Sequence, residues 1–264
     1  MEGPEGKNDE IDPTEGLNLR IYIQEKFGTR GESWLAWIFE RIRQAAGQRI
    51  LDLGCGPGTI WVYNAAQIPE TWQVILSDAD IEMVREARGA LEAFPRAFLY
   101  CTNEAGAIPL ADASVDLLLA IGLFDIVPEL PATMAEAWRV LAPGGRVLAA
   151  TGSNHHLHEL EALIKPIEPS AQLGKTSSRF SMENGAEQLS SRFRVLEQGM
   201  YTDTLTFTNP TPILMYYQSE SDLARRLKGK RLDELLGRIR REIETQGSLR
   251  VTVEKGTFLA QKSG

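Results

Sequence analysis

The stretch RILDLGCGPGTIW, Arg49 to Trp61, runs from an apolar segment directly into three glycines that are spaced by one residue each. Gly54, Gly56 and Gly58 can adopt backbone conformations that other residues disfavour, and they leave the main chain open to a ligand. A helical pattern follows them. The stretch therefore predicts a strand, a tight ligand-binding turn and a helix, rather than a turn with a purely structural role.

Two common phosphate-binding loops do not match this pattern. A P-loop is excluded because no Gly-Lys-Ser or Gly-Lys-Thr sequence follows the glycines. A dinucleotide-binding loop needs a third glycine where Thr59 stands. Asp52 lies two residues before the first glycine, and its carboxylate suits an ammonium or hydroxyl group of a ligand rather than a pyrophosphate.

The segment VILSDAD gives a second sign of a nucleoside site. Asp78 ends the next strand-like run, 20 residues after Gly58. An acidic side chain at this place can accept hydrogen bonds from both hydroxyls of a ribose. Alone, Asp78 would be interpreted as an aspartate of a surface turn. Together with the glycine loop, it predicts a nucleoside ligand without a pyrophosphate.

Strand-like apolar runs alternate with helical patterns through the first part of the chain. The strand-like runs are Ile50–Leu53, Val74–Leu76, Ala97–Tyr100, Val115–Ile121 and Arg146–Ala150, and the helical patterns are Trp34–Ala46, capped by Ser33, Thr59–Gln67, Ile81–Phe94 and Pro131–Leu141. Runs this apolar are buried on both faces of a sheet. The pattern predicts an α/β fold, with a doubly wound, Rossmann-like, mostly parallel sheet, helices on both faces and a ligand at the carboxyl ends of the strands.

The pattern loosens after Thr151. Strand-like runs return at Arg194–Tyr201 and Leu249–Ala260, and Leu214–Gln246 between them is helical in pattern. We expect a helical cap inserted after the fifth strand and before the last. The predicted organisation is a disordered tail at residues 1–13, a core with N-terminal lid helices at 14–151, and the cap with the final strands at 152–264.

Composition narrows the classes of partner and compartment. The chain has 264 residues and a net charge of −8, so its acidic surface disfavours nucleic-acid binding. Cys55 and Cys101 form neither a CxxC pair nor a metal-ligand spacing, which argues against a disulfide framework. The N-terminus lacks an apolar secretory segment, and no apolar run reaches the length of a membrane span. We expect a cytoplasmic protein without a membrane contact.

Residues 48–151 resemble the class I S-adenosylmethionine-dependent methyltransferases. The resemblance rests on LDLGCGPG, VILSDAD, NEAGAIPLADASVDLLLAIG and RVLAPGGRVLAA, in this order and spacing. TIWVYNAAQIP and SNHHLHEL also resemble uncharacterised bacterial small-molecule members. The resemblance implies S-adenosylmethionine as cofactor. By position it implies methionine contacts from Asp52, Gly54, Cys55, Gly56 and Gly58, ribose contacts from Asp78, adenine contacts from Ala79, Met83, Glu104 and Ala105, and a lining of the sulfonium side by Ile121 and Gly122.

Two residues are candidates for a catalytic base, which a hydroxyl or an acidic carbon acceptor needs. His156 follows the fifth strand and matches a histidine of the small-molecule subgroup, although a histidine on a surface helix is the alternative. Asp125 stands where many small-molecule members carry histidine, and it is interpreted as a base, a substrate ligand or a helix-capping residue. His155, His156 and His158 would be scattered around a continuous helix, so no metal centre is predicted.

Aromatic residues outside the resembling region are candidates for the acceptor pocket. Tyr22 and Phe27 are predicted to form a lid, His155 and Tyr216 to contact the acceptor, and Tyr201 and Tyr217 are further candidates. A place in the hydrophobic core is the alternative for these aromatic side chains. The stretch RRLKGKRLDELLGRIRR, residues 225–241, is locally basic; it is interpreted as a solvated helix with internal ion pairs, or as a contact for an anionic substrate or RNA.

These observations predict a methyltransferase that acts on a small-molecule acceptor. One alternative is a methyltransferase that acts on RNA or protein, which the acidic composition disfavours. Another is a non-catalytic nucleoside-binding scaffold, which the intact glycine motif disfavours.

Overall fold

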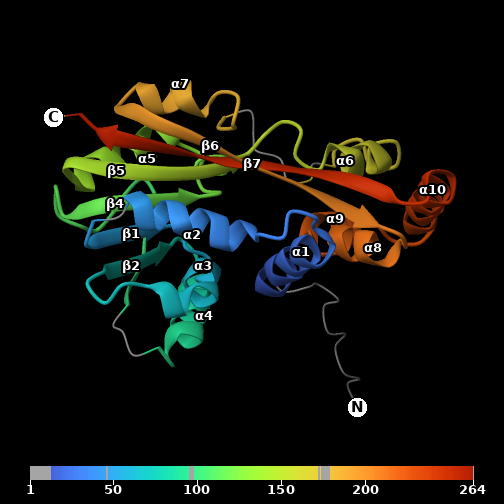
Figure 1. Ribbon diagram of the computed structural model, residues 1–264, viewed down its shortest axis with the longest axis horizontal. Coiled ribbons are helices and arrows are strands. Elements are labelled where there is room, and N and C mark those ends of the chain that lie inside the picture. The colour runs from blue at the N-terminus through green and yellow to red at the C-terminus, as the bar shows by residue number, and fades with distance from the viewer. Residues whose placement is uncertain (1–12, 46, 95–97, 172, 174–178, 264) are drawn as a thin grey trace, which may run out of the picture. The chain divides into compact units, whose positions relative to one another are not determined.

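The computed structural model describes residues 13–45, 47–94, 98–171, 173 and 179–263 (Figure 1). The predicted tail lies outside these residues except for Pro13, which begins helix α1 (Pro13–Phe27). The chain divides into two compact units. The sheet unit comprises Arg30–His156, Gly174–Thr202 and Val253–Gly264; the helical unit comprises Met1–Thr29, Leu157–Leu173 and Asp203–Thr252. This division differs from the predicted boundaries because α1 groups with the cap segments.

The described residues form a seven-stranded sheet in the order β3-β2-β1-β4-β5-β7-β6. The strands are β1 (Arg49–Leu53), β2 (Gln73–Asp78), β3 (Leu99–Thr102), β4 (Val115–Ile121), β5 (Leu141–Gly152), β6 (Phe193–Phe207) and β7 (Leu249–Lys262). Strands β1 to β5 pair in parallel, and β7 pairs antiparallel to β5. The doubly wound, mostly parallel fold is confirmed. Its strand order reverses between β1 and β4, where ligands of such sheets bind.

Strand register gathers the predicted site at one edge of the sheet. Leu53 pairs with Ser77, and Ser77 pairs in turn with Cys101. On the other side of β1, Ile121 at the end of β4 pairs with Ala150. The turns that follow β1, β2, β3 and β4 therefore leave the sheet at the same carboxyl edge.

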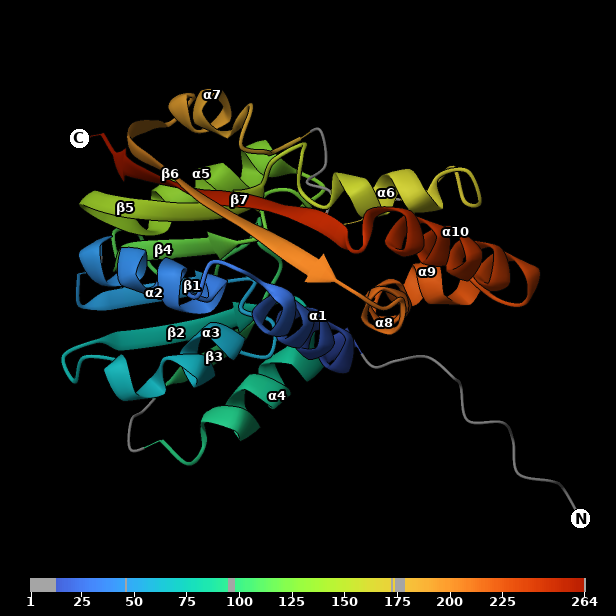
Figure 2. The same ribbon diagram turned by 45° about the vertical axis from the view of Figure 1, so that its right-hand side comes forward.

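Helices cover both faces of the sheet unit (Figures 1 and 2). One face carries α2 (Trp34–Ala45), α3 (Thr59–Tyr63), the short 3-10 helix at Ala65–Gln67 and α4 (Ile81–Leu91); the other carries α5 (Leu130–Val140) and α7 (Gly185–Ser190). Ser33 Oγ accepts the Ala36 N–H at 3.1 Å, which confirms the predicted cap of α2. Ile38 and Ile42 on this helix are fully buried, as its apolar spacing predicts.

Two element boundaries differ from the sequence prediction for local reasons. The predicted helix Thr59–Gln67 breaks after Tyr63, where the buried Asn64 side chain donates to the carbonyls of Ile60 and Leu35. Strand β5 begins at Leu141 instead of Arg146 because Leu141 already pairs with Val115, and the register shifts before Arg146. Pro143, Gly144 and Gly145 thus lie at an irregularity inside a strand.

The helical unit contains α1, α6 (His158–Ile164), α8 (Thr211–Gln218), α9 (Ser221–Arg226) and α10 (Lys230–Gln246). Helix α1 packs on α8, and Arg20 Nη1 donates to the Ser219 carbonyl at 2.8 Å. Tyr217 on α8 donates its hydroxyl to the Leu160 carbonyl of α6 at 2.7 Å. Within the described residues, no helix is long and apolar enough to cross a membrane.

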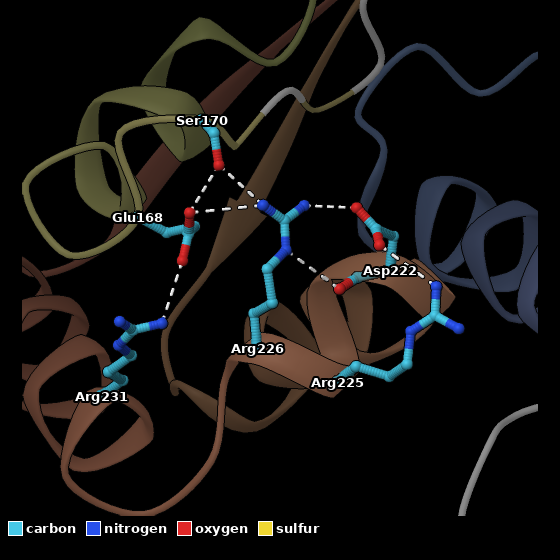
Figure 3. A network of polar contacts seen from close by, with 6 residues as sticks. All are labelled: Glu168, Ser170, Asp222, Arg225, Arg226 and Arg231. Carbon is cyan, nitrogen blue, oxygen red and sulfur yellow. Dashed lines mark hydrogen bonds and ion pairs between the residues drawn. The ribbon is translucent and has the colours of Figure 1, made fainter.

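Glu168 links three segments of the helical unit (Figure 3). Its carboxylate accepts from Ser170 Oγ at 2.5 Å, from Arg226 Nη1 at 3.3 Å and from Arg231 Nη1 at 3.2 Å. Arg226 also pairs with Asp222 within α9. Ion pairs therefore engage part of the basic stretch, including Arg225 with Asp222 and Arg238 with Glu234.

Candidate functional site

The glycine loop has the backbone that the sequence predicts. Gly54, Gly56 and Gly58 have φ angles of +75°, +54° and +72°. A Cβ on Gly54 would lie 2.8 Å from Leu123 Cδ1, and one on Gly58 would lie 3.2 Å from Ala87 Cβ. A Cβ on Gly56 would meet no atom within 4 Å. Packing therefore requires the first and third glycines, whereas the second faces open space.

The N–H groups of this loop are directed into the protein. Gly54 N and Cys55 N donate to the Ser77 carbonyl at 2.7 and 2.9 Å, and Gly56 N donates to Asp78 Oδ2 at 2.9 Å. A phosphate-binding loop needs such donors for its ligand. With these donors engaged at the end of β2, the loop is suited to a ligand without phosphate.

Asp52 is a buried carboxylate with one oxygen engaged. Its side chain is 1% exposed, and Oδ2 accepts the indole N–H of Trp61 at 2.7 Å. Among the described residues, Oδ1 has no hydrogen-bond partner. Burial raises the pKa of Asp52 to about 7, the Trp61 hydrogen bond opposes this increase, and the charge of Asp78 adds to it. A buried acceptor without a partner is costly, so this oxygen is suited to a donor group of a ligand.

Asp78 retains acceptor capacity at the end of β2. Oδ2 accepts from Gly56 N, and Oδ1 accepts from Asp80 N at 3.0 Å. A carboxylate has about four lone-pair sites, so two protein donors leave room for ligand hydroxyls. Ala79 is exposed and Met83 is half-buried, and both follow Asp78 where α4 begins.

The turn after β3 is joined to the same edge through Asn103. Ser77 Oγ donates to Asn103 Oδ1 at 2.7 Å, and Asn103 Nδ2 donates to the Glu104 carbonyl at 3.0 Å. Glu104 itself is exposed and Ala105 is half-buried against the core. Because its amide is occupied within the protein, Asn103 acts as a support for the two predicted adenine-binding residues.

The turn after β4 contains a second open glycine. Gly122 has a φ of +67°, and an added Cβ would meet no atom within 4 Å. Its N–H donates to the Ala150 carbonyl at 2.9 Å, and Ile121 before it is half-buried. Asp125 follows in the same turn, and burial raises its pKa to about 6. It is thus a carboxyl group that titrates close to neutral pH.

His156 is buried in the sheet unit instead of lying on a surface helix. Its Nδ1 accepts from the Glu254 N–H at 3.2 Å, which in a neutral imidazole leaves the proton on Nε2. Burial, followed by the charge of Lys255, lowers the pKa of His156 well below its ordinary range. His155 and His158 are exposed. The described residues contain no group of three His, Cys, Asp or Glu side chains arranged to hold a metal ion.

The aromatic candidates in the helical unit are Tyr22, Phe27, Tyr216 and Tyr217. Tyr22 is 55% exposed, and Phe27 packs on Phe207 with ring centroids 4.9 Å apart. Tyr216 is buried, and burial raises its pKa. Tyr217 is likewise a core residue, as is Tyr201 in the sheet unit, whose hydroxyl donates to the Glu32 carbonyl.

Sequence reasoning missed Trp61 as a residue of the site. It lies on α3, three residues after Gly58, and its indole N–H donates to Asp52 on β1. Nothing in the spacing of the glycine motif distinguishes this tryptophan from an ordinary core residue. Its role is visible only from the short contact to the buried carboxylate.

Comparisons with known proteins agree with this geometry. Residues 50–145, from β1 to within β5, match the family described as a methyltransferase domain. The chain is 33% identical over 134 residues to malonyl-[acyl-carrier protein] O-methyltransferase of Erwinia billingiae. The alignment covers 49% of each protein, so the chain spans about half the length of this relative.

Solved structures of low identity share the fold. A SAM-dependent methyltransferase from Aquifex aeolicus superimposes with a TM-score of 0.53 and 18% identity, over 72% of this chain and 93% of that one. The [4+2]-cyclase SpnF superimposes with a TM-score of 0.57 and 16% identity, over 94% and 92%. From the family match, the strand order and the structural comparisons, we conclude that the chain contains a methyltransferase domain with the fold of S-adenosylmethionine-dependent methyltransferases.

Proposed function

We propose that the protein transfers a methyl group from S-adenosylmethionine to a small-molecule acceptor. The observation that carries this proposal is Oδ1 of buried Asp52, which has no partner among the described residues. It lies at the end of the strand that leads into a glycine loop whose N–H groups donate within the protein. S-adenosylmethionine carries an ammonium group and ribose hydroxyls but no phosphate. It is therefore a ligand of the chemical kind that these groups accept.

The residues fit this cofactor group by group. Asp52 Oδ1 would accept from the ammonium group, and Asp78 would accept from the ribose hydroxyls. Gly56 and Gly122 would let the cofactor lie against the main chain, since a Cβ at either position would occupy open space. The cofactor has no phosphate, which is consistent with the loop N–H groups of Gly54, Cys55 and Gly56 donating within the protein.

When bound, the cofactor supplies an electrophilic methyl group on a sulfonium, and the protein supplies positioning and proton removal. Asp125 is the candidate base, because a carboxyl group with a pKa of about 6 is mostly ionised at neutral pH. His156 uses its Nδ1 lone pair on Glu254, so in this tautomer it contacts a substrate through its Nε2–H. His155, Tyr22 and Phe27 remain candidates for acceptor contacts, whereas Tyr216 is a core residue.

The acceptor class rests on charge and on the comparisons. The net charge of −8 opposes the binding of RNA. A protein-borne acceptor is the second candidate, because the named relative from Erwinia billingiae acts on an acyl-carrier protein. A non-catalytic or differently catalytic role is the third, because a cyclase has the same fold.

The experiment is a tracer assay with S-adenosylmethionine that carries a radiolabelled methyl group. The protein is incubated with a cell extract, which is then separated into small molecules and macromolecules. An Asp78→Asn variant, which should bind the cofactor more weakly, serves as the control at a low cofactor concentration. Label in the small-molecule fraction that depends on Asp78 supports the proposal. Label in RNA or protein moves the acceptor to the second candidate. No transfer, despite binding of S-adenosylhomocysteine, contradicts methyl transfer.

A further inference from the structure

Trp61 is held in place by packing that does not depend on its hydrogen bond. The side chain is fully buried on α3. Its ring meets Phe39 of α2 edge-on, with centroids 6.4 Å apart, and Phe98 at 6.3 Å. The indole N–H therefore reaches Asp52 from a fixed position rather than from a mobile side chain.

The hydrogen bond from Trp61 gives the two oxygens of the Asp52 carboxylate different surroundings. Oδ2 of Asp52 receives the indole N–H at 2.7 Å, whereas Oδ1 has no partner among the described residues. A carboxylate that is anchored through one oxygen cannot rotate freely about its last bond. The other oxygen is thus presented in one direction, and its unsatisfied state indicates that a ligand completes it.

We propose that Trp61 is a positioning residue of the cofactor site, which holds Asp52 through Oδ2 so that Oδ1 receives the ammonium group of the cofactor, and that cofactor binding releases a proton from Asp52. This inference rests on the proposed function. The proton leaves the Asp52 carboxyl group for the solvent, and the ammonium group keeps its own protons.

The surroundings of Asp52 explain why a proton is present to be released. Burial raises its pKa to about 7, the Trp61 N–H lowers it, and the charge of Asp78 on β2 raises it further. The Cys55 thiol beside it stays protonated, because burial and then the charges of Asp52 and Asp78 raise its pKa. Near neutral pH part of the free protein therefore carries a neutral Asp52, and an ammonium ion draws this group into its charged form.

The experiment is calorimetric titration with S-adenosylhomocysteine in two buffers of different ionisation enthalpy. Near neutral pH we expect a fraction of a proton to be released per ligand bound, and this fraction should fall towards zero as rising pH ionises Asp52 in the free protein. Methylthioadenosine is the matched control ligand, since it keeps the nucleoside and the thioether but lacks the ammonium group. Its binding should release no proton from Asp52.

Two variants separate positioning from packing. Trp61→Phe keeps an aromatic ring but removes the N–H, so S-adenosylhomocysteine should bind about tenfold or more weakly near neutral pH, with more proton release, while the affinity for methylthioadenosine stays unchanged. Asp52→Asn keeps an acceptor for Trp61 but cannot titrate, and should abolish the proton release. Circular dichroism checks that both variants are folded.

Three results would overturn the inference. One is S-adenosylhomocysteine binding to the unmodified protein without proton release, and this test needs no variant. Another is a Trp61→Phe variant that loses affinity for both ligands equally at every pH, which would mean a purely structural tryptophan. Failure of the unmodified protein to bind S-adenosylhomocysteine at all would overturn the proposed function as well, so the two failures are distinguishable.

Discussion

The backbone N–H of Gly56 donates to Oδ2 of Asp78 at 2.9 Å, so the loop after β1 is fastened to the last residue of β2. One aspartate thus shapes the glycine loop and offers its remaining lone pairs to a ligand. The Ser77 carbonyl adds two more hydrogen bonds from the same loop. The site is a single hydrogen-bonded unit built from the ends of two neighbouring strands.

Replacing Asp78 by asparagine should weaken S-adenosylhomocysteine binding by about tenfold or more, because hydrogen bonds to a charged group contribute about 1.5–3 kcal/mol each. Calorimetric titration measures this loss. The matched control is Asp116→Asn, since Asp116 pairs with Arg49 at 2.6 Å, next to the start of β1 and away from its carboxyl end. The control should lower stability without changing affinity. Equal affinity losses in both variants would mean that Asp78 acts only through the fold.

Gly56→Ala should abolish most cofactor binding, because the new Cβ enters the open space that the ligand would use. The positive φ adds backbone strain of about 1–2 kcal/mol. Gly31→Ala is the control, since Gly31 has a φ of +78° and also faces open space, in the turn before α2. Both variants should melt at lower temperature, and only the first should lose binding. If Gly56→Ala binds S-adenosylhomocysteine normally, the assignment of the glycine loop is incorrect.

Asp125→Asn should reduce turnover by about 100- to 10,000-fold and leave cofactor affinity intact, if Asp125 removes the proton of the acceptor. Burial raises its pKa to about 6, so the rate should increase as pH rises through this value and the carboxyl group ionises. This rise of the rate with pH should be absent from the residual activity of the variant. Unreduced turnover in Asp125→Asn would mean that Asp125 is not the base, and would leave a reaction without a base as the explanation.

The buried His156 should make the protein less stable in mild acid. Its folded-state pKa lies below its ordinary value of 6.5, so only the unfolded chain gains a proton as pH falls below about 6.5. This costs up to about 1.4 kcal/mol per pH unit. In His156→Asn, urea unfolding at several pH values should show a free energy of unfolding that falls less steeply with decreasing pH, because asparagine does not titrate. Asparagine can still accept the Glu254 N–H, so this hydrogen bond is kept.

The same His156→Asn variant tests the predicted role of this residue in the reaction. A lost base would lower turnover by about 100-fold or more, whereas a lost Nε2–H contact should mainly weaken acceptor binding. Turnover and acceptor affinity that both match the unmodified protein would exclude His156 from the site.

Glu168→Gln should destabilise the protein at neutral pH, because the carboxylate joins Ser170 to Arg226 and Arg231. The hydrogen bond from Ser170, followed by the two arginine charges, lowers the pKa of Glu168. Its stabilisation is therefore present above the ordinary pKa of about 4.5 and is lost as pH falls through the lower folded-state pKa. Melting curves should show the largest difference near neutral pH. Glu234→Gln, at an exposed ion pair within α10, should have little effect.

The sequence by itself predicted the features that depend on local chemistry. Strand β4 matches its predicted bounds, Val115–Ile121, because a continuous apolar run needs burial on both faces wherever it lies. The backbone of the glycine loop was also predicted, since positive φ angles favour glycine, and Asp78 ends its strand as its run predicts. Both signals are contained within a few neighbouring residues.

Only the tertiary structure decided the features that depend on contacts between distant residues. It paired Trp61 with Asp52, buried His156 against Glu254, and sent Tyr216 and Tyr217 into the core. It also grouped α1 with residues 157–173 and 203–252, far apart in the chain. Burial, hydrogen-bond partners and the pKa values that follow from them are properties of packed neighbours. A residue's type and spacing do not specify those neighbours until the chain is folded.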